Sequence, residues 1–510
     1  MDLKSGFGLI LLLGVSAASQ PSLAFAAGAL QAGVAVEPIL TDRPTVPVHD
    51  PLYAKALVLS DGERELAIAA LDTIGVNKSL ADDIRSRLQS ALGLKPSHVL
   101  VTATHNHHTQ GQVADDLVER VVKVVRRARE QMVPVRIGAG TGHEDRIVMN
   151  RRLLLQDGGQ WTIRRANPSP RDDEVAKLGP VDPQIGVLRI DRTDGRVLAV
   201  LYNYAVHAYG GAPDGGVTAD LPGAASAFLE ESLGPGAVAI FLQGAAGDIT
   251  PIRYKDVDAP PPTQQLGMML GLSTLRAVHR IRTEPAGRLL VTSETIVLPR
   301  RSDLQEKIAA LEAQQEKILQ FFTGIGCGAH GAGTFLNFKT FLPLYLKHTV
   351  DPEHPAYSSY LYLHESATGR HDLKHLDAEN RRRLQKYLES IHKMEELIRL
   401  RSNLQLLQRQ LARKERGEIR AELQAIRIGP LALITFPGEP YCEIGLRIKQ
   451  RSPFKHTFLV SYANGHVGYA PTADSYDTVC YENSHTPLAP QWQAIYEAAA
   501  QKLLRAIADE

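Results

Sequence analysis

The sequence has few cysteines, few aromatic residues and almost no net charge, and each shortage excludes a class of protein. Its 510 residues include three cysteines, two tryptophans and 6% aromatic residues, with a formal net charge of +1. This charge balance gives no electrostatic reason to expect nucleic acid or an acidic partner. The scarcity of aromatic rings argues against a surface that stacks on glycans or on single-stranded nucleic acid.

The three cysteines do not form a metal-binding pattern. They are Cys327, Cys442 and Cys480, and no Cys-x-x-Cys pair occurs, which excludes a cysteine zinc knuckle. An exported protein tolerates disulfides, so Cys442 and Cys480 can pair if their segments are neighbours. The spacing does not decide this, and we expect at least one cysteine to be free and buried.

Long hydrophobic runs are also absent except near the N-terminus. An apolar segment from Phe7 to Ser19 follows Lys4 and precedes the small-x-small site Ala24-Phe25-Ala26. This order predicts a signal peptide over residues 1–26 and a secreted or periplasmic protein. The segment is too short to span a bilayer comfortably, so the mature chain has no predicted transmembrane segment. The alternative is a buried N-terminal helix.

The remaining chain is 44% hydrophobic and 22% charged, which is typical of a globular protein. Strand and helix patterns alternate without an internal repeat, and this predicts an α/β fold with a mixed sheet over residues 27–510. The predicted strands are 56–59, 66–71, 97–103, 186–190, 197–204, 238–242, 431–436 and 457–462, and the predicted helices are 79–92, 114–132, 219–231 and 491–508.

Residues 302–426 differ in composition and predict a helical hairpin insertion. A helix rich in Glu, Gln, Lys and Ala covers 302–322, and a charged stretch with Leu and Ile at helical spacing covers 375–423. The intervening segment 324–364 is rich in glycine and aromatic residues. It can line a substrate entrance or form a plain surface connection.

Three histidines lie within four residues after a predicted strand, in Thr104-His105-Asn106-His107-His108-Thr109. In extended backbone, side chains at i and i+2 point the same way, so His105 and His107 can face one site. Imidazole is both the commonest metal ligand and a proton carrier near neutral pH. The loop therefore predicts a zinc site or, alternatively, an ordinary solvated loop.

Four other strand ends carry concentrated polar groups. They contain His207 in Ala-Val-His, Asp248 in Gly-Asp-Ile-Thr-Pro, Glu439 in Pro-Gly-Glu, and Tyr469 after Asn464. Each has an ordinary interpretation alone, as a core histidine, a turn residue or a core tyrosine. Several such motifs on one α/β scaffold converge on a shared site more often than by chance.

These five motifs, in this order, resemble the catalytic domain of the neutral, non-lysosomal ceramidase family. The resemblance spans roughly residues 27–490. It implies a zinc-dependent hydrolase whose catalytic domain has an α/β fold. By motif, the implied zinc ligands are His105, His207, Glu439 and Tyr469. The implied catalytic residues are His107, Arg151 of Asn150-Arg151, and Tyr481.

The implied reaction is attack of zinc-activated water on the amide carbonyl of an N-acylated substrate, such as a sphingolipid or another lipid. His107 would carry the proton, and Arg151 and Tyr481 would stabilise the oxyanion. Asp220 and Asp248 are candidates to orient the histidines, or are simply cap and turn residues. The resemblance assigns no role to His108 or His466.

The chain departs from the family in two places. Gly244 stands where ceramidases have a serine near the substrate, which puts ceramide itself in question. Only about 30 residues follow Tyr481, so no C-terminal immunoglobulin-like domain is expected. The rival functions are a deacetylase or esterase at the same metal, acting on a glycan or small amide, and a non-catalytic scaffold. The sequence does not indicate an oligomeric state.

Overall fold

The computed structural model describes residues 30–164, 169–212, 215–252, 263–285, 288–324, 338–355, 359–413, 415 and 417–509. The predicted signal peptide and Cys327 lie outside these residues. Among the described residues, no helix combines the length and apolar character needed to cross a membrane.

The body contains a large mixed sheet of eight strands in the order β12-β11-β10-β5-β1-β2-β3-β4. Strands β2 and β3, which contain the predicted strands 56–59 and 66–71, pair antiparallel around Asp61 and Gly62. The pairs β3–β4 and β11–β12 are parallel, so β4 and β12 each follow a crossover through a helix. The bounds are β1 Gln31–Pro38, β2 Tyr53–Ser60, β3 Glu65–Leu71, β4 Val99–Ala103, β5 Val133–His143, β10 Gln184–Arg192, β11 Val197–Tyr204 and β12 Val238–Gln243.

A second sheet of four strands packs face to face against the first. Its order is β14-β15-β16-β18, and its inward side chains, such as Leu433 and Phe458, share one buried cluster with Ile68 and Leu201 of the first sheet. Residues that alternate between two buried faces explain why these strands are apolar almost throughout. The bounds are β14 Leu289–Leu298, β15 Ile419–Ile428, β16 Leu431–Thr435 and β18 His456–Val460.

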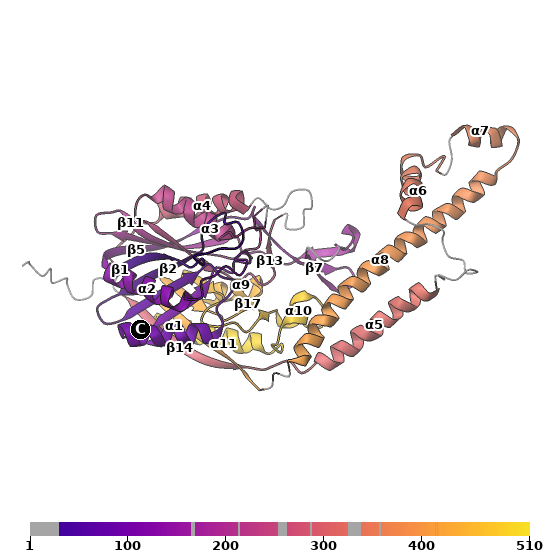
Figure 1. Cartoon of the computed structure of the whole chain (residues 1–510). Coiled ribbons are helices and arrows are strands. Elements are labelled where there is room, and N and C mark those ends of the chain that lie inside the picture. The colour runs from indigo at the N-terminus through magenta and orange to yellow at the C-terminus, as the bar shows by residue number, and fades with distance from the viewer. Residues whose placement is uncertain are drawn as a thin grey trace, which may run out of the picture.

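Helices cover the outer faces of both sheets, so the body has four layers (Figure 1). Helices α1 and α2 pack on the β1–β4 half of the large sheet, and α3 and α4 pack on its β10–β12 half. Helix α11, predicted at 491–508, covers the small sheet together with α9. The bounds are α1 Lys78–Leu92, α2 Leu117–Glu130, α3 Asp220–Leu233, α4 Thr263–Arg280, α9 Cys442–Arg451, α10 Tyr481–His485 and α11 Trp492–Asp509.

Short strands connect the body to the site. Strands β6 and β13 pair, as do β17 and β19, and β7 pairs with both β8 and β9. The bounds are β6 Val148–Asn150, β7 Arg152–Leu155, β8 Gln160–Thr162, β9 Val175–Leu178, β13 Ile249–Pro251, β17 Glu439–Pro440 and β19 Tyr469–Ala470.

Cys442 and Cys480 are both free and buried, which confirms the expectation that at least one cysteine is free and buried.

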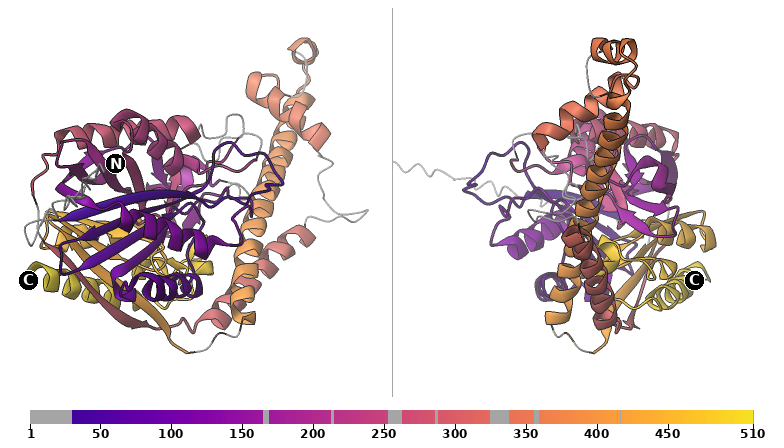
Figure 2. Two further views of the ribbon diagram at one scale, coloured as in Figure 1. Left: turned by 60° about the vertical axis from the view of Figure 1, so that its left-hand side comes forward. Right: turned by 90° about the vertical axis from the view of Figure 1, so that its right-hand side faces the viewer.

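The predicted helical hairpin forms a long arm that projects beyond the body (Figures 1 and 2). Helix α5 (Leu304–Gly324) packs against the C-terminal half of α8 (Asp372–Ala412) through a small apolar cluster that includes Leu311 and Leu407. Two shorter helices, α6 (Phe338–Val350) and α7 (Ser359–Ala367), lie at the far end. We call residues 304–412 the arm.

The predicted helix over 375–423 ends too late, and the predicted insertion boundary at 426 includes part of the core. Helix α8 stops at Ala412, Gly417 adopts a positive φ of 89°, and β15 begins at Ile419. In β15, buried Ile419 and Ala421 flank exposed Arg420, a period of two that belongs to a strand. Charged residues are common on both sides of this boundary, so the sequence pattern did not show the change from the helical period to the strand period.

Candidate metal centre

His105 follows β4 in a backbone conformation that the sequence did not suggest. Its φ is 61°, in the left-handed region that is rare for residues other than glycine. The expectation of an extended segment is therefore wrong. The two histidines nevertheless meet, because the left-handed residue turns the chain within the loop. Such a conformation persists only where surrounding contacts enforce it, and it is common at functional sites.

Two contacts hold the His105 ring. Its Nδ1 donates to the carbonyl oxygen of Ile74 at 2.7 Å, and its face stacks on Tyr462 with ring centroids 4.1 Å apart. Since Nδ1 carries the proton in the neutral ring, Nε2 is unprotonated and carries a lone pair. Tyr462 was not identified from the sequence, since an aromatic residue at a strand end is ordinarily part of the core.

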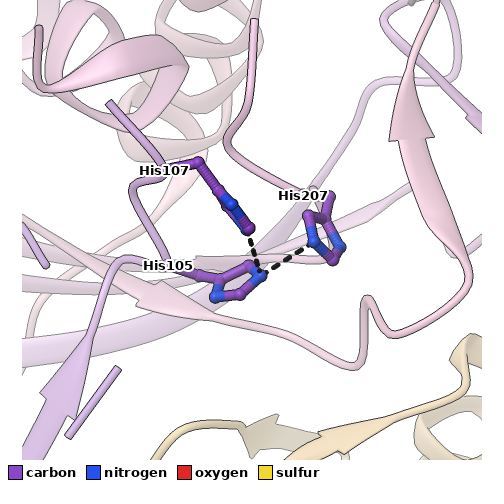
Figure 3. A group of neighbouring side chains, drawn as sticks. All are labelled: His105, His107 and His207. Carbon is purple, nitrogen blue, oxygen red and sulfur yellow. Dashed lines mark hydrogen bonds between the residues drawn. The ribbon is translucent and has the colours of Figure 1, made fainter. Parts of the chain in front are cut away.

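His207 lies just after β11 and meets His105 from the other side (Figure 3). Its Nδ1 donates to the carbonyl oxygen of Ala246 at 3.1 Å, so its Nε2 is also a lone pair. The two Nε2 atoms are 2.8 Å apart, and His107 Nε2 lies 2.9 Å from His105 Nε2. Burial lowers the pKa of His105 and of His207 well below the ordinary value, so both rings are neutral.

Glu439 supplies a buried carboxylate beside the imidazoles. It pairs with Tyr469 across β17 and β19, and its Oε2 lies 3.8 Å from His105 Nε2. Among the described residues, Oε2 has no hydrogen-bond partner, while Oε1 lies 3.2 Å from His466 Nε2. Burial raises the pKa of Glu439 to about 7, although Arg151 opposes this. His466, to which the sequence assigned no role, therefore contacts the site.

Arg151 lies behind Tyr469 and is 3% exposed. Its Nη2 donates to the Tyr469 hydroxyl at 3.1 Å and to the carbonyl oxygen of Gly247 at 2.7 Å. Its Nε donates to Glu482 at 2.8 Å, and its Nη1 donates to Tyr209 at 2.8 Å. A guanidinium has five N–H groups, so one Nη1 hydrogen has no acceptor among these described contacts.

Tyr481, at the start of α10, completes the group. Its ring centroid is 5.6 Å from that of Tyr469, and the Arg164 guanidinium lies 3.7 Å from the Tyr481 centroid. The fold thus brings all seven predicted site residues into one cluster, from segments far apart in the chain. The seven are His105, His107, Arg151, His207, Glu439, Tyr469 and Tyr481.

The two aspartates accept hydrogen bonds from backbone amides, and Asp220 Oδ2 also lies 3.8 Å from His108 Nε2. Asp248 accepts from the Cys442 backbone at the start of α9 at 2.8 Å. Asp220, with a φ of 57°, opens α3 and accepts from Gly211 N at 2.9 Å. The imidazole Nδ1 atoms of His105 and His207 donate to backbone carbonyls, so neither aspartate orients these two rings.

A cleft of about 900 Å³ leads to the site, with Glu439, His466 and Tyr469 at its wall. None of the described residues within 324–364 lines this cleft, and residues 325–337 and 356–358 lie outside the described structure, so the entrance interpretation stays a prediction. The base of the arm lines the cleft instead, through Leu304, Gln305, Gln410, Leu411 and Arg413.

Gly244 makes a close backbone approach next to this site. A Cβ at this position would lie 2.9 Å from the backbone nitrogen of Ala205, too close for an ordinary contact. A serine would therefore require the strand ends to move apart, which explains in steric terms the departure noted in the sequence.

Together the fold and the site define a four-layered α/β protein with a buried, histidine-rich centre at its strand ends. No family model and no curated protein matches the chain. The solved structures that match include one of neutral ceramidase from Pseudomonas aeruginosa and one described as ceramidase complexed with C2. Each has a TM-score of 0.60 and 18% sequence identity, and covers 94% of this chain and 75% of the other. The predicted resemblance is thus confirmed for the fold.

Proposed function

We propose that the protein is an exported zinc-dependent hydrolase that cleaves the amide bond of an N-acylated substrate. The observation that carries this proposal is that the unprotonated Nε2 atoms of His105 and His207 face each other at a distance of 2.8 Å. Both Nδ1 protons are committed to carbonyl oxygens, so two lone pairs would repel each other without a cation between them. Three histidines with ligand atoms within 4.8 Å of one another suit a divalent metal.

The proposed ligands are His105, His207, Glu439 and Tyr469. Two neutral nitrogens with a carboxylate and a phenolic oxygen suit zinc. The lone Oε2 of Glu439 supports this set, because a buried carboxylate oxygen without a partner is costly unless it coordinates a cation. The other arrangement on this geometry is three imidazoles, with His107 as a ligand.

Bound Zn²⁺ would polarise the substrate carbonyl and lower the pKa of water from about 15.7 towards about 7. His107 would accept the proton and return it to the leaving amine, and its position 2.9 Å from His105 Nε2 supports this role. The remaining Nη1 hydrogen of Arg151 and the Tyr481 hydroxyl would donate to the carbonyl oxygen as it gains charge. Arg151 also holds the Tyr469 hydroxyl in position.

The substrate class follows from the cleft and from the ceramidase fold. Aliphatic side chains of Leu304, Leu411 and Val467 suit an acyl chain, and this supports a lipid such as a sphingolipid or another N-acylated compound. Arg300, Arg301 and Arg413 make the same cleft polar, which favours the second candidate, a deacetylase or esterase acting on a smaller polar amide or glycan. Export rests on the N-terminal segment alone.

Metal content and turnover test the proposal together. Purified protein should contain about one zinc per chain by elemental analysis and release fatty acid from N-acyl amines. The pair His105→Ala and His207→Ala should lose both zinc and turnover. A matched control replaces two exposed histidines, His143 and His392, whose side chains are 65% and 48% exposed, and should keep both.

Other results would change the proposal in defined ways. Release of acetate with no release of longer acyl chains would favour the deacetylase. Zinc without turnover on any acyl substrate would favour a non-catalytic scaffold. Full turnover in the double alanine variant would overturn the metal site altogether.

A further inference from the structure

The arm carries most of the exposed large hydrophobic side chains in the part of the chain that the structure describes. Eleven of the 17 exposed large hydrophobic side chains among the described residues lie in the arm, and six of these lie on α6 and α7 at its far end. Soluble proteins rarely gather apolar side chains in one exposed place without a function for them. We call α6 and α7 the tip; its exposed residues are Leu342, Tyr345, Leu346, Val350, Tyr360 and Leu363.

The exposed residues of α6 follow the spacing of one helix face. Leu342, Leu346 and Val350 are four residues apart and are 43%, 51% and 80% exposed. On the neighbouring face, Phe341 is buried and packs on Tyr387 of α8, with ring centroids 4.6 Å apart. Helix α6 is therefore fixed to the arm by one face and presents a second apolar face outward. In α7, Tyr360 and Leu363 are 66% and 68% exposed at an i, i+3 spacing.

Basic residues lie beside α6, on that helix and on the stretch of α8 against which it packs. Helix α6 contains Lys339 and Lys347 and no acidic residue, and α8 contains Arg381, Arg382, Arg383 and Lys386 next to Tyr387. Two of these cations are paired, Lys347 with Asp351 and Arg383 with Glu379. Lys339 lies three residues before Leu342, and Lys374 lies in the first turn of α8, just beyond α7. Apolar faces bordered by lysine, arginine and tyrosine are typical of helices that lie in the surface of an anionic bilayer.

We propose that the tip docks on an anionic lipid surface and tethers the catalytic body to it. The arm is suited to this because α8 has 41 residues, about 60 Å at 1.5 Å per residue, and carries the tip clear of the body (Figures 1 and 2). Such surface attachment needs no helix that spans the bilayer. The docking does not depend on the reaction proposed above.

Vesicle flotation tests the docking directly. The full chain should float with vesicles of phosphatidylcholine and phosphatidylglycerol, and less with phosphatidylcholine alone. The variant Leu346→Glu, Val350→Glu, Leu363→Glu should partition at least about tenfold less, because three buried apolar groups are lost. A matched control changes three exposed residues of α5 and α8, away from the tip, and should float like the unaltered protein. Its substitutions are Leu319→Glu, Met394→Glu and Ile398→Glu.

A fluorescent reporter locates the contact. The two native tryptophans, Trp161 and Trp492, are 8% and 0% exposed, so Val350→Trp adds a distinct exposed signal. On anionic vesicles this signal should shift to shorter wavelength and be quenched by lipids with a quencher in the acyl chain. No flotation of the unaltered protein, or flotation that survives the tip substitutions, would overturn the proposal. Self-association abolished by the tip substitutions, without vesicle binding, would instead assign the tip to a second copy of the chain.

Activity keeps this result separate from the proposed function. The tip variant should hydrolyse a soluble short-chain N-acyl amine at an unchanged rate, since its substitutions lie far from the cleft. If neither the unaltered protein nor the tip variant hydrolyses any amide but the unaltered protein still binds vesicles, the proposed hydrolase function is wrong and the docking proposal stands.

Discussion

At the scale of single residues, the centre depends on how two imidazole rings are oriented. His105 and His207 each donate Nδ1–H to a main-chain carbonyl, of Ile74 and Ala246. Such contacts on the far ring nitrogen orient metal-binding histidines and set their tautomer. The carbonyls belong to loops elsewhere in the chain, so the tautomers follow from the fold instead of from the histidine motif.

Replacing His107 distinguishes a proton carrier from a metal ligand. We expect His107→Ala to keep about one zinc per chain while kcat falls by about 10²–10⁴-fold, because general acid–base transfer contributes that much. Elemental analysis and steady-state kinetics on the same preparation measure both quantities. Loss of zinc would show that His107 is a ligand and that the three-imidazole arrangement is the correct one.

At the scale of elements, the arm packs on a small apolar seam. Leu311, Leu404 and Leu407 are buried between α5 and α8, and the base of both helices lines the cleft. The N-terminal half of α8 extends past this seam with little cover. Stability along the arm is therefore local and separable from that of the sandwich.

Removing one seam residue tests that separation. Leu407→Ala should cost about 2–5 kcal/mol of local stability, as expected for a buried leucine. Amide hydrogen exchange should speed up in α5 and the C-terminal half of α8, while β3 and β16 keep their protection. As a control, Leu411→Ala changes a side chain that is 37% exposed and should leave exchange nearly unaltered. Equal acceleration in the sheets would show that arm and body unfold together.

At the scale of the whole molecule, stability includes the cost of buried charge in the body. Asp72 is 7% exposed beneath the histidine loop and accepts a hydrogen bond from Tyr53 N at 2.9 Å. Burial raises the pKa of Asp72 from 3.8 to about 6. The folded state therefore holds this proton more tightly than the unfolded state, and the stability from Asp72 is lost as pH rises through this range.

The pH dependence of unfolding checks this sign. In chelator-treated protein, Asp72→Asn should become progressively more stable relative to the unaltered chain between about pH 4 and pH 6. The difference should change by about 3 kcal/mol, from two pKa units at 1.36 kcal/mol each. Urea unfolding at several pH values measures it. A pH-independent difference would mean that Asp72 titrates normally in the folded protein.

Much of this protein follows from local pattern. Alternation and helical spacing predicted most strands and helices, since each element buries one face and repeats with its own period. The candidate site residues were also found from the sequence, because histidine, carboxylate and phenol groups stand where apolar strands end. The change from α8 to β15 was missed, since charged residues dominate both sides of the boundary.

Other features required the assembled fold. The left-handed turn at His105, the lone pairs that face each other, and the cleft wall built by the arm all arise from contacts between distant segments. Local sequence motifs determined which side chains are available to the candidate site. Only tertiary packing decided which of them meet, because segment pairing and desolvation depend on residues hundreds of positions apart.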